Sequence, residues 1–183
     1  MDTSTITAYN YIGKLDTASW FAKINEFTRE EWLEYDWRQR VFAVHRHTET
    51  IPLIFNEEFD KSIPTQREKY NYFFEEIAEL EKIFESFYGP GFIVRLIIVN
   101  MLANTNISTH VDKGNSLTIG RRHHIPIITN EGVIFTIGGE AKHMKQGEIW
   151  EINNQLAHSV VNHGSKDRVH LIADWITKNN EKN

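Results

Sequence analysis

Two residues of types that bind metal ions lie two positions apart in the sequence. His110 and Asp112 form a His-x-Asp pair, and a third candidate, His158, follows later in the chain. Two imidazoles and one carboxylate make up the facial triad of non-haem Fe(II) oxygenases, which leaves positions on the metal open for a cosubstrate and oxygen. Residues i and i+2 of a strand point to the same face, so both members of the pair could bind one ion. We therefore expect a metal site formed by His110, Asp112 and His158.

Each of these residues also has a simpler interpretation. The chain contains nine histidines, so a His-x-Asp pair can arise by chance. A histidine at a strand end is more often a surface or hydrogen-bonding residue than a metal ligand. Asp112 precedes Lys113-Gly114-Asn115 and could simply begin a turn. The order of the three residues, and the strands expected around them, favour the metal site.

An arginine in the same region could bind an anionic cosubstrate. Arg168 begins an apolar run, residues 168–176. A guanidinium that faces a protein interior is costly unless it meets an anion, and its planar fork suits a carboxylate. Close to a metal site, that anion would fit the far carboxylate of 2-oxoglutarate. The alternative is a salt bridge at the rim with Glu148 or Asp167.

A second polar set lies on the segment 121–129. Arg122 and His124 would share one face of a strand there, and Arg121 and His123 the other. Only one of the two faces can point inward. We expect Arg122 and His124 to be the inward pair.

The elements that must position these residues are mostly short strands. β-Branched and alternating segments in the second half of the chain are separated by turns rich in Gly and Asn. The segments are 92–102, 107–112, 121–129, 132–138, a short piece around 141–145, 148–153, 157–163 and 168–176. Closely spaced strands with such turns favour an antiparallel sandwich or barrel. We predict an eight-stranded, cupin-like jelly roll, also called a double-stranded β-helix.

The first half of the chain is mixed. Apolar residues recur at helical spacing in 15–27 and 65–88, and short apolar runs at 41–44 and 51–55 predict strands. The charged stretch 29–40 supports no prediction of secondary structure. The expected fold class is therefore mainly β with N-terminal helices (α+β). A single domain over residues 1–183 would hold a helical or mixed portion, 1–91, and a jelly-roll catalytic core, 92–177.

Composition limits the protein class. A chain of 183 residues at 40% hydrophobic can bury a sizeable core. Cysteine is absent from the sequence, residues 1–5 do not resemble a secretory signal, and no apolar run is long enough to span a bilayer, so we expect a cytoplasmic protein without a membrane partner. A net charge of −5 argues against a nucleic-acid partner. Only residues 178–183 are expected to be frayed.

The segment 95–175 resembles the catalytic part of the aspartyl/asparaginyl β-hydroxylase family of Fe(II)/2-oxoglutarate dioxygenases. The resemblance rests on NMLANTNISTHVD (100–112), RRHHIPIITNEGV (121–133) and GEIWEINNQLAHSVVNHGSKDRVHLIADW (147–175). These contain a His-x-Asp, then Arg-x-His-aliphatic-Pro, then Gly-Glu-aliphatic-Trp, and finally the second His and Arg. Residues 1–90 carry no such likeness.

The resemblance implies a role for particular residues. His110, Asp112 and His158 would bind Fe(II). Arg168 would pair with the distal carboxylate of 2-oxoglutarate, helped by the amide of Asn100. The remaining roles are contacts with the cosubstrate or substrate. They fall to Arg122 and His124 near the metal. Independently of the resemblance, the clusters 37–40 and 45–47 could line the mouth of the pocket, where His45 and Arg46 would contact the substrate; the alternative is a solvated charged loop.

The resemblance also implies the reaction. Fe(II), 2-oxoglutarate and O2 would support hydroxylation of an amino acid, or of an Asp/Asn/Pro-type residue of a peptide or protein. The partner would then be a small-molecule or peptide substrate; nothing in the sequence indicates the oligomeric state. Two alternatives stay open: a cupin-like metal-dependent isomerase or hydrolase, and a non-catalytic jelly-roll binding module.

Overall fold

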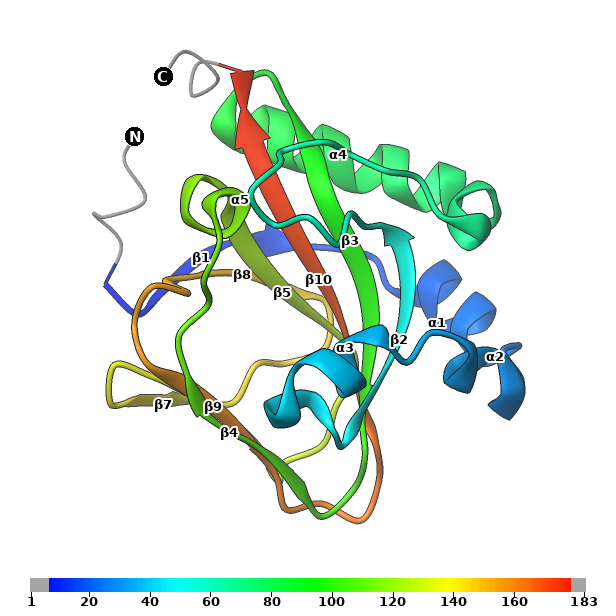
Figure 1. Ribbon diagram of the computed structural model, residues 1–183, viewed down its shortest axis with the longest axis vertical. Helices are drawn as coiled ribbons and strands as arrows, with labels where there is room; N and C mark the ends of the chain where they lie inside the picture. The colour runs from blue at the N-terminus through cyan, green and yellow to red at the C-terminus, as the bar shows by residue number, and fades with distance from the viewer. Residues whose placement is uncertain (1–6, 179–183) are drawn as a thin grey trace.

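The computed structural model describes residues 7–178 as two antiparallel sheets with helices around them (Figure 1). The large sheet has the order β1-β8-β5-β10-β3-β2 and the small sheet the order β4-β9-β6-β7. The expected lack of a signal in 1–5, and all of the expected frayed end 178–183 except Lys178, fall outside the described residues. The large-sheet strands are β1 (Tyr9–Lys14), β2 (Thr48–Ile54), β3 (Gly91–Met101), β5 (Arg121–Ile128), β8 (Glu148–Ile152) and β10 (Arg168–Thr177). The small-sheet strands are β4 (Thr105–His110), β6 (Val133–Ile137), β7 (Glu140–Lys142) and β9 (His158–Asn162).

The strands β3 to β10 are the eight that the sequence predicts, and the predicted jelly-roll class is confirmed. The N-terminal portion adds a strand at each edge of the large sheet. One of them, β1, was not predicted from the sequence; it pairs with β8. The other, β2, begins at Thr48, earlier than the predicted strand at 51–55.

The helices lie mainly in the N-terminal portion. They are α1 (Ala18–Ile24), α2 (Arg29–Glu34), α3 (Trp37–Val41), the 3-10 turns η2 (Ala43–His45) and η3 (Glu68–Phe73), α4 (Phe74–Tyr88) and the short α5 (Asn115–Ile119). The helix predicted over 65–88 is thus a 3-10 turn followed by α4. The strand predicted at 41–44 is wrong, because this run forms the end of α3 and then η2. Its apolar residues Val41 and Phe42 line a cavity, where the ring of Phe42 stacks on that of Phe59.

Helix α4 covers the outer face of the large sheet (Figure 1). Its buried residues Leu80 and Phe84 belong to the same apolar cluster as Leu171 and Trp175 of β10. Because side chains alternate along a strand, Arg168, His170 and Ile172 occupy the opposite face, between the two sheets. Helix α4 therefore stabilises one face of the large sheet and leaves the other to form the site.

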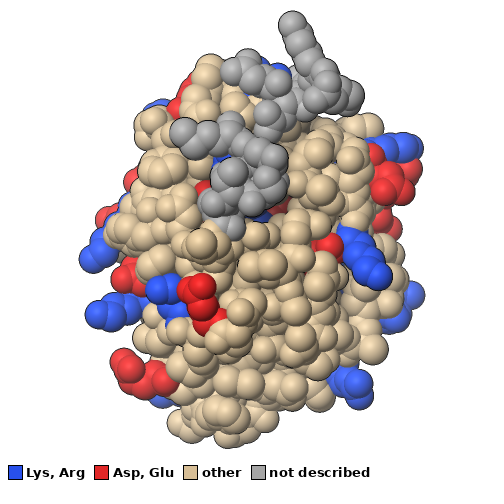
Figure 2. Space-filling model, turned by 90° about the vertical axis from the view of Figure 1, so that its left-hand side faces the viewer, with Lys and Arg blue, Asp and Glu red and all other residues tan. Residues whose placement is uncertain are grey.

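The surface carries both signs of charge. Figure 2 shows a face on which basic and acidic side chains lie interspersed along the sides, with an uncharged area between them. None of the helices within residues 7–178 has the length and hydrophobicity needed to cross a membrane.

Candidate metal centre and cavity

Strand pairing brings the two candidate histidine ligands together. In the ladder between β4 and β9, His110 is the direct partner of His158. Their ring centroids are 4.3 Å apart. Such a pair of opposed residues on two antiparallel strands holds both imidazoles on one face of the small sheet.

Asp112 completes the group from the loop that follows β4. It lies two residues beyond the end of the strand, and its backbone N–H donates to the carbonyl of Asn154. Its Oδ1 is 3.8 Å from Nε2 of His110, and its Oδ2 is 3.9 Å from Nε2 of His158. One ligand atom from each residue lies within 4.8 Å of the others. The structure thus brings together the three residues that the sequence selects.

The histidine tautomers suit metal binding. Nδ1 of His110 lies 2.9 Å from the carbonyl of Ser108, and Nδ1 of His158 lies 2.9 Å from the carbonyl of Leu156. Because a carbonyl only accepts, both rings carry the proton on Nδ1, which leaves the Nε2 lone pair free. Burial lowers the pKa of His158 below its ordinary value, so that ring stays neutral. Two imidazoles and a carboxylate form a donor set that fits Fe(II).

Arg122 connects the carboxylate of Asp112 to the large sheet. It donates to Asp112 from Nη1, and its Nε and Nη2 hold Asp174 at 2.8 Å each. Asp174 also pairs with Arg95 at 2.5 Å. Burial alone would lower the pKa of Arg122, but Asp112 and Asp174 raise it above its ordinary value. The loop that carries Asp112 is therefore fixed to β5 by a charged hydrogen bond.

Arg168 is buried without a carboxylate partner among the described residues. Its side chain is 1% exposed, Nη2 lies 2.7 Å from Nδ1 of His170, and Nε has no hydrogen-bond partner within residues 7–178. Burial, and secondarily the charge of Arg38, lowers its pKa to about 9. With His124 and the three candidate ligands it lines a narrow cavity of about 30 Å³. A buried guanidinium with no counterion is expected to bind an anion.

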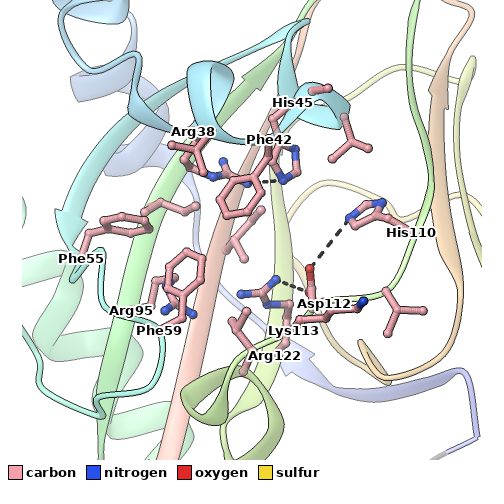
Figure 3. Close-up of a pocket in the computed structure, with 17 residues that line it drawn as sticks. Arg38, Phe42, His45, Phe55, Phe59, Arg95, His110, Asp112, Lys113 and Arg122 are labelled. Carbon is pink, nitrogen blue, oxygen red and sulfur yellow. Dashed lines mark hydrogen bonds and ion pairs between the residues drawn. The ribbon is translucent and has the colours of Figure 1, made fainter.

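A larger cavity of about 380 Å³ opens on the other side of the same group (Figure 3). The two cavities share Arg38, His45, His110, Asp112, Arg122 and Ile172 in their walls. Figure 3 shows Arg38 and His45 above the cavity and His110 and Asp112 at its side. The candidate metal group thus lies between a narrow recess that leads to Arg168 and a wider, largely apolar space.

Other predicted site residues divide into two groups. Arg122 and His124 lie on the inner face of β5, as expected, and His45 lines both cavities. Asn100 is not brought to the site: it lines neither cavity, and its amide donates to Glu49 at 3.0 Å and Asp167 at 3.2 Å. Arg46 is exposed, lines neither cavity and donates to the carbonyl of Ala43.

Sequence reasoning did not select Arg95, and it named Arg38 only as one member of the cluster 37–40 that could line the mouth of the pocket. Arg95 lies within a long β-branched run, where nothing marks it as facing the cavity. Arg38 belongs to the charged stretch 29–40, which gave no helical or strand pattern. Its only signal was its position in a cluster of charged and aromatic residues in the N-terminal portion.

Comparison with solved structures agrees with this architecture. An oxidoreductase of the 2OG-Fe(II) oxygenase family from Burkholderia pseudomallei superposes with a TM-score of 0.57 at 14% identity, covering 90% of this chain and 91% of the other. A viral collagen prolyl hydroxylase from Paramecium bursaria Chlorella virus-1, solved with 2OG, gives 0.56 at 10% identity and covers 93% and 96%. A prolyl-4-hydroxylase from Pseudomonas putida gives 0.53 at 10% identity and covers 97% and 96%. At these identities the likeness establishes the fold.

Sequence comparison supplies the family. A search of curated proteins gave no significant match. The aspartyl/asparaginyl β-hydroxylase family, in contrast, matches residues 23–178, which include every residue of the candidate site and most of the helical portion. The chain therefore belongs to the aspartyl/asparaginyl β-hydroxylase family.

Proposed function

We propose that this protein is an Fe(II)- and 2-oxoglutarate-dependent dioxygenase that hydroxylates an amino acid, or an Asp/Asn/Pro-type residue of a peptide or protein. The observation that carries the proposal is the position of Arg168. It is a buried guanidinium that pairs with no carboxylate in the described part of the chain, and it lies in the wall of the same narrow cavity as the three candidate metal ligands. Family membership and the likeness to 2OG-Fe(II) oxygenases support Fe(II), 2-oxoglutarate and O2 as cofactor and cosubstrates.

Each site residue then has a role. His110, Asp112 and His158 would hold Fe(II), and Arg168 would bind the distal carboxylate of 2-oxoglutarate. When bound, iron would support the oxidation of an unactivated C–H bond by O2, with one oxygen atom entering the product and the other entering succinate as 2-oxoglutarate loses CO2. The protein supplies binding, orientation and a water-poor cavity. No side chain is required as a general base.

The recess between Asp112 and Arg168 has to widen when the cosubstrate binds. Its volume of about 30 Å³ is too small for a dicarboxylate, but its wall is continuous with that of the larger cavity. His124 and His170 border Arg168 through neutral rings, because burial lowers the pKa of both far below the ordinary value. Neutral neighbours leave the charge of Arg168 available for the carboxylate.

Two measurements test the proposal. Anaerobic protein loaded with Fe(II) should develop a metal-to-ligand absorbance band when 2-oxoglutarate is added, and the band should be lost in His158→Ala. With O2 and a panel of free amino acids and peptides, succinate should form above background. Metal binding that is insensitive to 2-oxoglutarate would instead favour the isomerase or hydrolase, and unchanged metal content in His158→Ala the binding module.

A further inference from the structure

Arg38 is a second buried guanidinium that lacks a carboxylate partner among residues 7–178. It is 8% exposed, and it donates from Nη1 to the hydroxyl of Thr50 and from Nη2 to Nε2 of His45, each at 3.1 Å. Neither partner neutralises it, because a threonine hydroxyl and a histidine ring carry no negative charge. Burial, followed by the charge of Arg122, lowers the pKa of Arg38 to about 10. A charge in this position is costly until an anion binds.

The wall of the larger cavity carries surplus positive charge. Arg95 and Arg122 are matched by the carboxylates of Asp112 and Asp174. Arg38 and the exposed Lys113 line the same cavity, and neither forms an ion pair within the described part of the chain. The Arg38 fork is held in place by its two neutral partners, a geometry that suits bidentate binding of a carboxylate.

The rest of the wall is apolar. Figure 3 shows Phe42, Phe55 and Phe59 around the cavity, on the side away from His110, and Ile97 and Ile172 also line it. A volume of about 380 Å³ lies at the lower end of the range of small-molecule sites, roughly 300–1,000 Å³. The space therefore fits a small molecule with an apolar body and one anionic group.

We propose that Arg38 binds the carboxylate of the primary substrate, and that this substrate is a small monocarboxylate whose apolar body packs against Phe42, Phe55 and Phe59. The inference rests on the proposed function, because it places the reacting carbon beside the candidate metal ligands. The carboxylate can belong to an amino acid or to an acid without an amino group. Arg168 lies in the narrow recess and is reserved for the cosubstrate.

The test measures binding by calorimetry to protein loaded with Mn(II) and 2-oxoglutarate. The probes are 4-methylpentanoate and 3-phenylpropanoate, their primary amides, L-leucine and L-phenylalanine. At least one acid should bind, and its amide should bind at least about tenfold more weakly, since the guanidinium then loses its charged partner. Tight binding of the amino acids beside weak binding of the amino-free acids would identify the carboxylate as that of an amino acid.

Variants assign the effect to Arg38. Arg38→Met should lower the affinity for the acid at least about tenfold and bring the acid and amide affinities together. Arg46→Met is the matched control, because this arginine lies close by in the chain but is exposed and outside the cavity. If circular dichroism shows that Arg38→Met does not fold, Arg38→Gln takes its place with the same expected loss.

The outcomes separate this inference from the proposed function. Unchanged 2-oxoglutarate affinity in Arg38→Met, with lost acid binding, supports the substrate role. An equal loss of 2-oxoglutarate binding would make Arg38 a cosubstrate contact and overturn the inference. The inference would also be overturned if every acid failed to bind the wild-type protein, or if the amides bound more tightly than the acids. In either case, the absorbance band with Fe(II) and 2-oxoglutarate would show whether the proposed function still stands.

Discussion

Arg122 donates a hydrogen bond to the carboxylate of Asp112, the candidate ligand that lies outside any strand. The same guanidinium is held by Asp174 through two hydrogen bonds of 2.8 Å, and Asp174 is held in turn by Arg95. This row of alternating charges runs from the loop after β4 to the central strands of the large sheet. It gives a loop residue the fixed orientation that metal binding requires.

Replacing Arg122 should therefore weaken metal binding as well as the fold. In Arg122→Met we expect Mn(II) affinity to fall by about 10–100-fold, because a residue that orients a ligand is lost. The free energy of unfolding should fall by about 3–5 kcal/mol, because Asp112 and Asp174 lose a buried partner. Calorimetric Mn(II) titration and urea unfolding measure the two effects.

Arg121 provides the matched control for this prediction. It pairs with Glu151 at 2.6 Å on the opposite face of β5. Arg121→Met should destabilise the protein, yet leave Mn(II) affinity within about twofold, since it touches none of the candidate ligands. Equal Mn(II) affinity in both variants would show that Arg122 does not orient Asp112.

The histidine ligands can be tested by metal content. His158→Ala removes one of the three donors, so Fe(II) or Mn(II) affinity should drop by more than about 100-fold, beyond the effect of losing an orienting residue. His163→Ala, an exposed histidine one residue past the end of β9, should bind metal as the wild type does. Metal retained at full occupancy in His158→Ala would remove this residue from the ligand set.

Much of the fold follows from local patterns in the sequence. The eight jelly-roll strands were predictable because period-two alternation and Gly- or Asn-containing turns are short-range signals. The strand at 41–44 was mispredicted because the same apolar residues suit a cavity wall as well as a sheet. Only the three-dimensional structure shows which of these surroundings Val41 and Phe42 have.

The site was predictable where spacing or family resemblance fixes it, and unpredictable where it depends on register. Asn100 shows the limit. It is the partner of Val169, one position away from Arg168, and a one-residue offset places a side chain on the other face of the sheet. Arg38 shows a second limit. The sequence could place residues 37–40 at the pocket only as a group, because tertiary packing decides which of them reaches the cavity.

The pH dependence of stability should follow in part from His123. This ring is fully buried against Phe84, and burial lowers its pKa to about 4 from 6.5, although Glu151 partly opposes the shift. Between those two pH values the unfolded chain binds a proton that the folded protein excludes. The contribution of His123 to the free energy of unfolding is therefore fully present above pH 6.5. It is lost as the pH falls toward 4, by up to about 1.4 kcal/mol per pH unit.

The contribution of His123 can be isolated by substitution. In His123→Gln the slope of unfolding free energy against pH should decrease between pH 4 and 6.5. The other buried histidines contribute equally to both proteins, so the difference between the two slopes belongs to His123. Denaturant unfolding at several pH values measures the slope, and identical slopes in His123→Gln and the wild type would contradict the assignment.

Arg168 should behave differently from Arg95, because Arg168 has no ion-pair partner among residues 7–178, whereas Arg95 pairs with Asp174. Arg168→Met loses the hydrogen bond to His170 but also removes an uncompensated charge, so the free energy of unfolding should change by no more than about 1 kcal/mol. Arg95→Met, which breaks the ion pair with Asp174, should lose about 3–5 kcal/mol of unfolding free energy.

In the presence of Mn(II), Arg168→Met should bind 2-oxoglutarate at least about 30-fold more weakly, because the distal carboxylate then lacks its partner. A large loss of stability in metal-free Arg168→Met with unchanged 2-oxoglutarate affinity would make Arg168 a structural residue and require another group to bind the cosubstrate.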